Sequence, residues 1–277
     1  MTKAVITLIG AGNMAASIIG GLLESGHPAA NLHAADPAAE SLANLRKLGA
    51  LAVYSDNAAA CTEADVVIVA VKPQVMREAL QSIAAPVRAR RALVISIAAG
   101  TTIASMEAVL GDGAAIVRCM PNTPALLGVG ASGLYANSQV DADQHALAGT
   151  ILGAVGLIEW VPEEALLDAV TALSGSGPAY FFLFMEAMIN AGCSMGLSRD
   201  CATVMARQTA LGAARMALES DVDLAELRRR VTSPGGTTER AVECFEREGL
   251  RDLVTHAMTA AQQRAAEMGA ESEQERV

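Results

Sequence analysis

Six residues near the start of the chain have the composition of a phosphate-binding turn. The stretch Gly10 to Ala15 reads Gly-Ala-Gly-Asn-Met-Ala, follows the apolar run Val5 to Ile9 and precedes the helical run Ser17 to Leu23. A first glycine permits a tight turn, a second lets the backbone approach a pyrophosphate, and a small third residue lets a helix pack closely on the strand. A glycine turn that only joins strand to helix is the alternative. The pattern predicts a dinucleotide site at the positive end of the helix, formed by Gly10, Ala11, Gly12, Asn13 and Met14.

Asp36 stands directly after the second apolar run, Leu32 to Ala35. An acidic residue at this point of a dinucleotide-binding unit can accept hydrogen bonds from the adenosine ribose. Asp36 favours NADH, because a carboxylate repels the additional phosphate of NADPH and because Pro37 and two alanines follow instead of an arginine. The alternative is that Asp36 caps a helix beginning at Pro37.

A second candidate site lies in the loop Thr232 to Thr238, which reads Thr-Ser-Pro-Gly-Gly-Thr-Thr between two helical runs. Two glycines, ending with Gly236, precede a helix expected from Thr238, so we expect exposed backbone N–H groups that can hold a carboxylate. The hydroxyls of Ser233, Thr237 and Thr238 can add donors. An ordinary capped loop is the alternative.

Residues for metal, thiol or serine chemistry are not arranged in a recognisable pattern. The cysteines form no CxxC pair and have no histidine at metal-ligand spacing, so we expect buried free thiols and no metal site. The four histidines lie far apart and are interpreted as surface or packing residues. Ser174 and Ser176 lack a GxSxG elbow, which argues against a hydrolase. The cysteines are Cys61, Cys119, Cys193, Cys201 and Cys244.

Short apolar runs alternate with helical stretches in the first part of the chain, as in the strand-helix units of a parallel sheet. We expect an α/β Rossmann domain with a doubly wound, mostly parallel sheet over residues 1–162. Ligands of such sheets bind at the carboxyl ends of strands, where Val71-Lys72-Pro73, Ile97 to Gly100 with Ala99, and Met120 to Pro124 would lie. The expected strands are Val5–Ile9, Leu32–Ala35, Val66–Val71, Leu93–Ile97 and Ile116–Cys119, with weaker candidates at Ala131–Tyr135 and Leu157–Val161.

Strand patterns stop after Pro162 and long helical periods follow, which predicts an all-helical domain over residues 163–277. The run Pro178–Met195 is apolar around most of its circumference, more than one small helical domain can cover, and therefore predicts at least a dimer. The other expected helices are Glu163–Leu173, Arg199–Glu219, Leu224–Val231, Thr238–Glu248 and Leu250–Met268.

Charge and hydropathy exclude several classes of partner. The formal net charge is -10, with 30 acidic and 20 basic residues, so we expect no nucleic-acid binding. The run Pro178–Met195 contains Glu186 and Asn190 and is interpreted as a buried helix, so we expect no membrane contact. No signal-peptide pattern opens the sequence, and a cytoplasmic location is expected.

Six stretches along the chain are together typical of one known family. They are Gly10–Ala15, Ala70–Pro73, Ser96–Gly100, Met120–Ala125, Leu173–Tyr180 and Thr232–Thr238. In these motifs the chain resembles the pyrroline-5-carboxylate reductases. The resemblance covers both expected domains in order, and the last two stretches are its most specific part.

The resemblance implies a reaction, a cofactor and an assembly. Hydride from the nicotinamide C4 of NADPH or NADH would reduce C5 of 1-pyrroline-5-carboxylate to give L-proline, the last step of proline biosynthesis. Members often prefer NADPH and carry small polar or basic residues after the second strand. This chain departs from that pattern, because an acidic residue, Asp36, stands there. The helical domain would interlock with that of a second subunit in a homodimer, and the family includes rings of five dimers.

The resemblance also assigns site residues. Asn57, Val71, Lys72 and Ala99 would line the cofactor, and Glu164, Thr237 and Thr238 would lie near the substrate, although the loop at Pro162 differs in length from the family pattern. Imine reduction needs a bound carboxylate, a proton on nitrogen and a hydride donor, but no metal and no covalent nucleophile. We expect Thr238 to orient the imine or to relay a proton to its nitrogen.

Two alternatives stay open from the sequence, and a third is disfavoured. A different cyclic imine or a ketimine could be the substrate, and a non-catalytic nicotinamide sensor could keep the same fold. The β-hydroxyacid dehydrogenases share the two-domain plan but use a lysine in the helical domain. The lysines here are Lys3, Lys47 and Lys72, all before Pro162, which argues against that chemistry.

Overall fold

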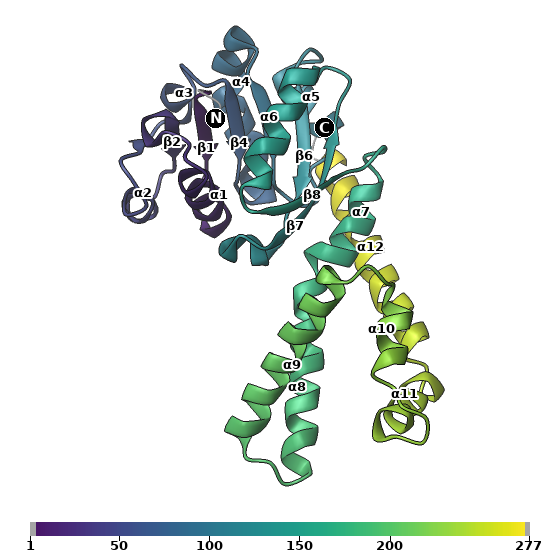
Figure 1. Ribbon diagram of the computed structural model, residues 1–277. Helices are drawn as coiled ribbons and strands as arrows, with labels where there is room; N and C mark the ends of the chain where they lie inside the picture. Colours follow the sequence, from purple (N-terminus) through teal and green to yellow (C-terminus); the bar gives the residue numbers. More distant parts are fainter. Residues whose placement is uncertain (1–3, 275–277) are drawn as a thin grey trace. The chain divides into compact units, whose positions relative to one another are not determined.

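Eight strands form one sheet in the computed structural model, which describes residues 4–274 (Figure 1). The strand order is β3-β2-β1-β4-β5-β6-β7-β8. Neighbouring strands are parallel except β6 and β7, which are antiparallel. The doubly wound, mostly parallel sheet predicted from the sequence is therefore confirmed. The strands are β1 (Ile6–Ile9), β2 (Leu32–Ala35), β3 (Ala52–Tyr54), β4 (Val66–Val69), β5 (Leu93–Ser96), β6 (Ile116–Met120), β7 (Gly130–Ala136) and β8 (Gly156–Trp160).

Helices cover both faces of this sheet, and the central strands are buried as a result. The helices are α1 (Asn13–Glu24), α2 (Ala39–Arg46), α3 (Asn57–Ala60), α4 (Met76–Arg90), α5 (Ile103–Leu110) and α6 (Ala142–Gly153). Side chains of β1, β4 and β5 are buried at every position and alternate between two apolar clusters. Leu8 and Ile68 pack with Ile18 of α1 on one face, whereas Val67 packs with Ile83 of α4 on the other.

The strand β3 was not predicted from the sequence. It has three residues, Ala52–Tyr54, all only partly buried at the edge of the sheet. Such a short edge strand lacks the apolar run by which the other strands were found. The candidates at Ala131–Tyr135 and Leu157–Val161 correspond to β7 and β8.

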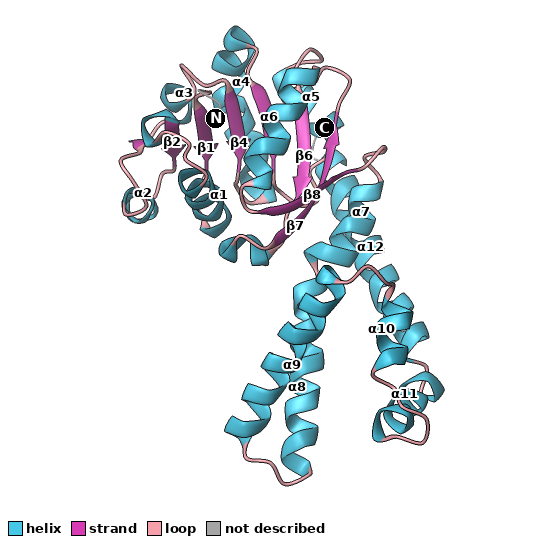
Figure 2. Cartoon of the chain, in the orientation of Figure 1, coloured by secondary structure: helices cyan, strands magenta, loops and turns pink. Residues whose placement is uncertain are grey.

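All elements after β8 are helical, as Figure 2 shows. The helix expected at Glu163–Leu173 is wrong in its bounds, because an α-helix over Leu166–Val170 changes there into a π-helical segment, Thr171–Gly175. The other expected helices lie within one residue of their predicted bounds, except that the last one continues past Met268 to Gln274. The helices are α7 (Leu166–Val170), α8 (Gly177–Ser194), α9 (Arg199–Glu219), α10 (Leu224–Arg230), α11 (Thr237–Arg247) and α12 (Leu250–Gln274).

The chain divides into two compact units. The first contains the residues up to Ser176 together with those from Ala260 onward, and the second runs from Gly177 to Thr259. The long helix α12 thus begins in the second unit and ends in the first. The boundary given by packing therefore falls after Ser176, whereas the last strand, β8, already ends at Trp160.

No helix within residues 4–274 is long and apolar enough to cross a membrane. Within the same range, no group of three or more His, Cys, Asp or Glu side chains could hold a metal ion.

Candidate cofactor and substrate sites

Four loops meet at one edge of the sheet because β1, β4, β5 and β6 are parallel neighbours. Backbone hydrogen bonds continue just past the strand ends and hold these loops side by side. The amide of Ala70 donates to the carbonyl of Ile9 at 2.8 Å, and the amide of Ile97 donates to that of Val69 at 3.2 Å. This is the edge at which doubly wound sheets bind ligands.

The glycine loop after β1 has the geometry of a dinucleotide turn. Gly10 has φ +98°, and a Cβ there would lie 2.6 Å from the carbonyl oxygen of Ala70, so no side chain fits. Gly12 caps α1 without any side-chain hydrogen bond, and the space where its Cβ would stand is open. Ala15 is fully buried against the sheet. The open amides at the start of α1 therefore fit a pyrophosphate.

Asp36 braces this loop from the end of β2. One carboxylate oxygen accepts a hydrogen bond from the amide of Ala11 at 2.8 Å, and the other accepts from the amide of Ala38 at 2.8 Å. The following helix, α2, begins at Ala39 with Ala38 as its N-cap and has no side-chain cap. The interpretation of Asp36 as a helix cap is therefore wrong, because its carboxylate serves the glycine loop and a turn instead.

The residues assigned to the cofactor by resemblance lie around the same edge. The side chain of Val71 stands 3.2 Å from where a Cβ of Gly10 would be. Lys72 is exposed and precedes a short 3-10 turn that starts at Pro73. Asn57 is the first residue of α3, and its side-chain Nδ2 donates to the Ser82 hydroxyl at 3.0 Å.

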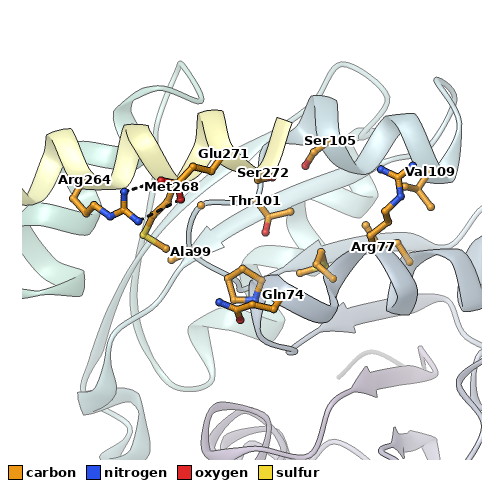
Figure 3. A pocket seen from close by; sticks show the side chains of 14 residues that line it. Gln74, Arg77, Ala99, Thr101, Ser105, Val109, Arg264, Met268, Glu271 and Ser272 are labelled. Atoms are coloured by element: carbon orange, nitrogen blue, oxygen red, sulfur yellow. Dashed lines mark hydrogen bonds and ion pairs between the residues drawn. The ribbon is translucent and has the colours of Figure 1, made fainter. Parts of the chain in front are cut away.

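Ala99 and Pro73 border a cavity of about 180 Å³ behind the loop after β5 (Figure 3). The other walls come from α4, α5 and the last turns of α12. Gly100 has φ +71°, and a Cβ there would lie 2.8 Å from the Cβ of Met268 on α12. Thr102 donates a hydrogen bond to Glu273 of the same helix at 2.9 Å. The end of α12 is therefore packed directly on the β5–α5 loop.

A partly buried ion pair joins β6 to the segment before α7, and a further hydrogen bond joins that segment to the start of α5. The Arg118 side chain on β6 is 10% exposed, and its Nη1 donates to Oε1 of Glu164 at 2.6 Å. The same oxygen accepts from the amide of Ile103, the first residue of α5, at 2.8 Å. Burial raises the pKa of the nearby Asp168, while Arg118 lowers it and Glu164 raises it.

The motif at the end of β6 is held by the π-helical segment. Asn122 is buried, accepts from the amide of Ala131 at 2.9 Å and donates to the carbonyl of Ser174 at 3.0 Å. A Cβ on Gly175 would lie 2.5 Å from the Cε of Met120. Two of the motifs that carry the family resemblance are thus in direct contact.

The loop of the second unit presents an open helix start. The amide of Gly235 donates to Oε2 of Glu239 at 2.7 Å, and that of Gly236 donates to the carbonyl of Ser233 at 3.0 Å. The glycine amides, which we expected to be free, are therefore used to close the loop itself. No hydrogen bond from the amides of Thr237 and Thr238 occurs among the described residues, and no side chain caps α11. These amides are available to a carboxylate.

Sequence reasoning missed Arg118 as a site residue and overstated the burial of the thiols. An arginine within the apolar run Ile116–Met120 was the available signal, because a buried charge requires a partner. Cys61 and Cys119 are buried as expected, but Cys201 and Cys244 are exposed. All five cysteines are free.

Taken together, the sheet edge and the open start of α1 define a nicotinamide-dinucleotide oxidoreductase with an additional helical region. Residues 5–100 match the family model described as NADP oxidoreductase, coenzyme F420-dependent. Residues 164–268 match the model described as pyrroline-5-carboxylate reductase dimerisation.

Relatives match over nearly the whole chain. A pyrroline-5-carboxylate reductase of Pseudomonas aeruginosa is 56% identical over 95% of this chain and 96% of its own length. A solved structure of a pyrroline-5-carboxylate reductase from Coxiella burnetii is 43% identical, with a TM-score of 0.93 over 96% of this chain and 99% of that one. The Plasmodium falciparum enzyme, solved with NADP bound, is 30% identical, with a TM-score of 0.85 over 97% and 99%. The chain belongs to the pyrroline-5-carboxylate reductase family.

Proposed function

We propose that this protein reduces 1-pyrroline-5-carboxylate to L-proline with NADPH or NADH, the last step of proline biosynthesis. The observation that carries the proposal is the 56% identity to a relative of that name over 95% of the chain. The site residues support it, because the open amides of α1 suit a dinucleotide and those of α11 suit a carboxylate.

The residues of the sheet edge would hold the cofactor. Gly10, Ala11, Gly12, Asn13 and Met14 would contact the pyrophosphate, and Asp36 the ribose. The bound dinucleotide would supply hydride from its nicotinamide to C5 of the imine. The remaining proposed cofactor contacts are Asn57, Val71, Lys72, Pro73 and Ala99.

The helix start of α11 would hold the substrate. The amides of Thr237 and Thr238 would bind the carboxylate, helped by the Ser233 hydroxyl and the backbone at Gly236. The Thr238 hydroxyl would donate to the imine nitrogen or pass a proton to it from water, since a threonine hydroxyl is itself a poor acid. The resemblance also assigns Glu164 to the substrate, and its contacts are considered below.

We further propose a division of labour along the chain and an assembly. Residues 1–162 would bind the cofactor, and residues 163–277 would bind the substrate and form a homodimer. The match of residues 164–268 to a dimerisation model supports this division. Assembly into rings of five dimers and a cytoplasmic location are the remaining proposals.

The test is a spectrophotometric assay with the purified protein. We expect NADH or NADPH absorbance to fall only when 1-pyrroline-5-carboxylate is added, with L-proline appearing in equal amount. Faster turnover of a six-membered cyclic imine would identify another substrate. Binding of NADH without turnover of any imine would instead indicate a sensor.

A further inference from the structure

We propose that Glu164 is a positioning residue, which holds the β5–α5 loop in the place required for cofactor binding and acts through Ile103 and Arg118. The inference rests on the proposed role of Ala99 in lining the cofactor. It differs from the substrate contact that the resemblance assigns to Glu164.

The first observation is that both close contacts of Glu164 fall on one oxygen. Oε1 accepts from the amide of Ile103 at 2.8 Å and from Arg118 at 2.6 Å. Ile103 opens α5, so its amide is one of the donors that have no partner inside the helix. A carboxylate is favoured at that positive end. Glu164 therefore fixes the start of α5 together with Thr102, whose hydroxyl caps the helix by accepting from the amide of Ser105 at 3.2 Å.

The second observation concerns the loop that precedes α5. Ala99 and Gly100 form a tight turn, and within residues 4–274 the amides of Ala99, Gly100 and Thr101 donate no hydrogen bond to another strand or helix. These amides do not tie the turn to neighbouring elements, so its position depends on the anchors that follow it. Glu164 anchors Ile103, four residues after Ala99, and α12 covers Gly100 from the other side.

The third observation is that Arg118 ties this anchor to the next loop. Its side chain is 10% exposed and that of Glu164 is 28% exposed, so water screens the pair only in part. Removing Glu164 would leave a buried guanidinium without its partner, which is costly. Arg118 lies two residues before Met120, so its displacement would reach the motif after β6. One carboxylate thus sets two loops of the proposed cofactor edge.

The experiment measures NADH binding in the absence of imine, by fluorescence titration, in the full-length protein. Glu164→Ala loses both contacts, and we expect the Kd for NADH to rise about tenfold. Glu164→Gln keeps an acceptor but loses the charge, and we expect a rise of about threefold. Arg118→Lys keeps the positive charge with a different geometry. Its Kd for NADH should also lie between that of the parent and that of Glu164→Ala. These rises are order-of-magnitude expectations for a charged hydrogen bond in a partly buried site.

Glu163→Gln is the matched control, because Glu163 is exposed and the same charge is removed one residue away. Its Kd for NADH should equal that of the parent. The proposal is overturned if Glu164→Gln and Arg118→Lys bind NADH like the parent. Unchanged NADH binding with a raised KM for the imine would assign Glu164 to the substrate. Unchanged binding with a lowered Tm would leave it a purely structural role.

These results are independent of the proposed reaction. NADH binding needs no imine, so a protein that binds NADH but does not turn over 1-pyrroline-5-carboxylate still tests Glu164. If Glu164→Ala does not fold, the ranking of Glu164→Gln and Arg118→Lys against the parent decides.

Discussion

Asp36 supports the glycine loop and is also the residue that we propose for the ribose contact. Its two oxygens accept hydrogen bonds from the amides of Ala11 and Ala38. A substitution there changes both the charge and the brace. The replacement residue therefore determines whether the experiment reports the loss of the charge alone or the loss of the charge and the hydrogen bonds to the loop.

Asp36→Asn removes the charge and keeps one acceptor oxygen for Ala11. We expect kcat/KM with NADPH relative to NADH to rise about tenfold, equivalent to about 1.4 kcal/mol, because a repulsive charge disappears. Asp36→Ser should raise the same ratio but weaken both cofactors, because it loses the brace. Steady-state kinetics with each cofactor provide the ratio. An unchanged ratio in both variants would restrict Asp36 to supporting the loop.

Thr238 is the hydroxyl that we place closest to the chemistry. For Thr238→Ala we expect kcat to fall about 100-fold, at the lower end of the range for a lost proton-transfer group, because water can replace the hydroxyl. The Kd for NADH should be unchanged, because the glycine loop is untouched. Thr238→Ser should restore most of the rate. Turnover by the alanine variant at the parent rate would exclude a role in proton transfer.

At the scale of elements, the contact between α12 and the β5–α5 loop constrains the proposed cofactor edge. Gly100 needs a positive φ and also has no room for a Cβ beneath Met268. Gly111, at the other end of α5, has φ +100° and open space around it. A comparison of alanine substitutions at these two glycines therefore distinguishes the cost of backbone strain from the cost of packing against α12.

Gly100→Ala should lower the free energy of unfolding by roughly 2–4 kcal/mol, and Gly111→Ala by roughly 1–3 kcal/mol, because only the former adds overpacking to the backbone strain. Urea unfolding at one pH measures both values. Gly100→Ala should also weaken NADH binding, whereas Gly111→Ala should not. Equal losses of stability would mean that α12 moves aside without cost.

Elements with a clear hydrophobic pattern could be predicted from the sequence, and elements without one could not. Apolar runs such as Val66–Val69 identify buried strands, but the three partly buried residues of β3 carry too little pattern. The π-helical segment that starts at Thr171 lies against Met120 at the end of β6, a long-range contact that periodicity does not report.

The candidate site was predictable only where function lies in a local motif. Gly10–Ala15 and Thr232–Thr238 could be found from the sequence because turns and helix starts are encoded locally. The pair of Arg118 and Glu164 could not, since its partners are 46 residues apart and meet only through the register of β6 and the course of the segment before α7. For the same reason, the contact between Asn122 and Ser174 was not foreseen.

At the scale of the whole molecule, the second unit exposes more apolar surface than a stable monomer usually does. On α8, Phe181 is 69% exposed, Phe182 60% and Leu183 67%, and on α9 Val204 is 64% exposed. These side chains suit an interface with a second copy, in the region that matches the dimerisation model.

We expect light scattering at assay concentration to give at least the mass of a dimer. Phe182→Glu should shift the protein toward monomer and lower activity, because a charge would be buried in the interface. Ala142→Glu, on an exposed position of α6 in the first unit, is the control and should leave the mass unchanged. A folded and active monomer of the parent chain would contradict the assignment.

Stability at alkaline pH should report the two buried thiols. Burial is the main cause that raises the pKa of Cys61 to about 12, with a further contribution from the charge of Asp56, and burial also raises the pKa of Cys119 to about 12. Between the ordinary thiol pKa of about 8.5 and about 12, the folded state binds more protons than the unfolded state, so the free energy of unfolding falls as the pH rises. Below that window the thiols contribute no pH dependence. Denaturant unfolding from pH 8 to 10 should show this slope, and Cys119→Ala should reduce it.

The return of α12 to the first unit has a consequence for the order in which the protein is made. Met268 and Glu273 complete the packing of the loop that carries Gly100 and Thr102. A ribosome produces every strand of the sheet long before it reaches these residues. The loop after β5, at the proposed cofactor edge, therefore gains this packing only after α12 has been synthesised, and a chain truncated after Thr259 would lack that support.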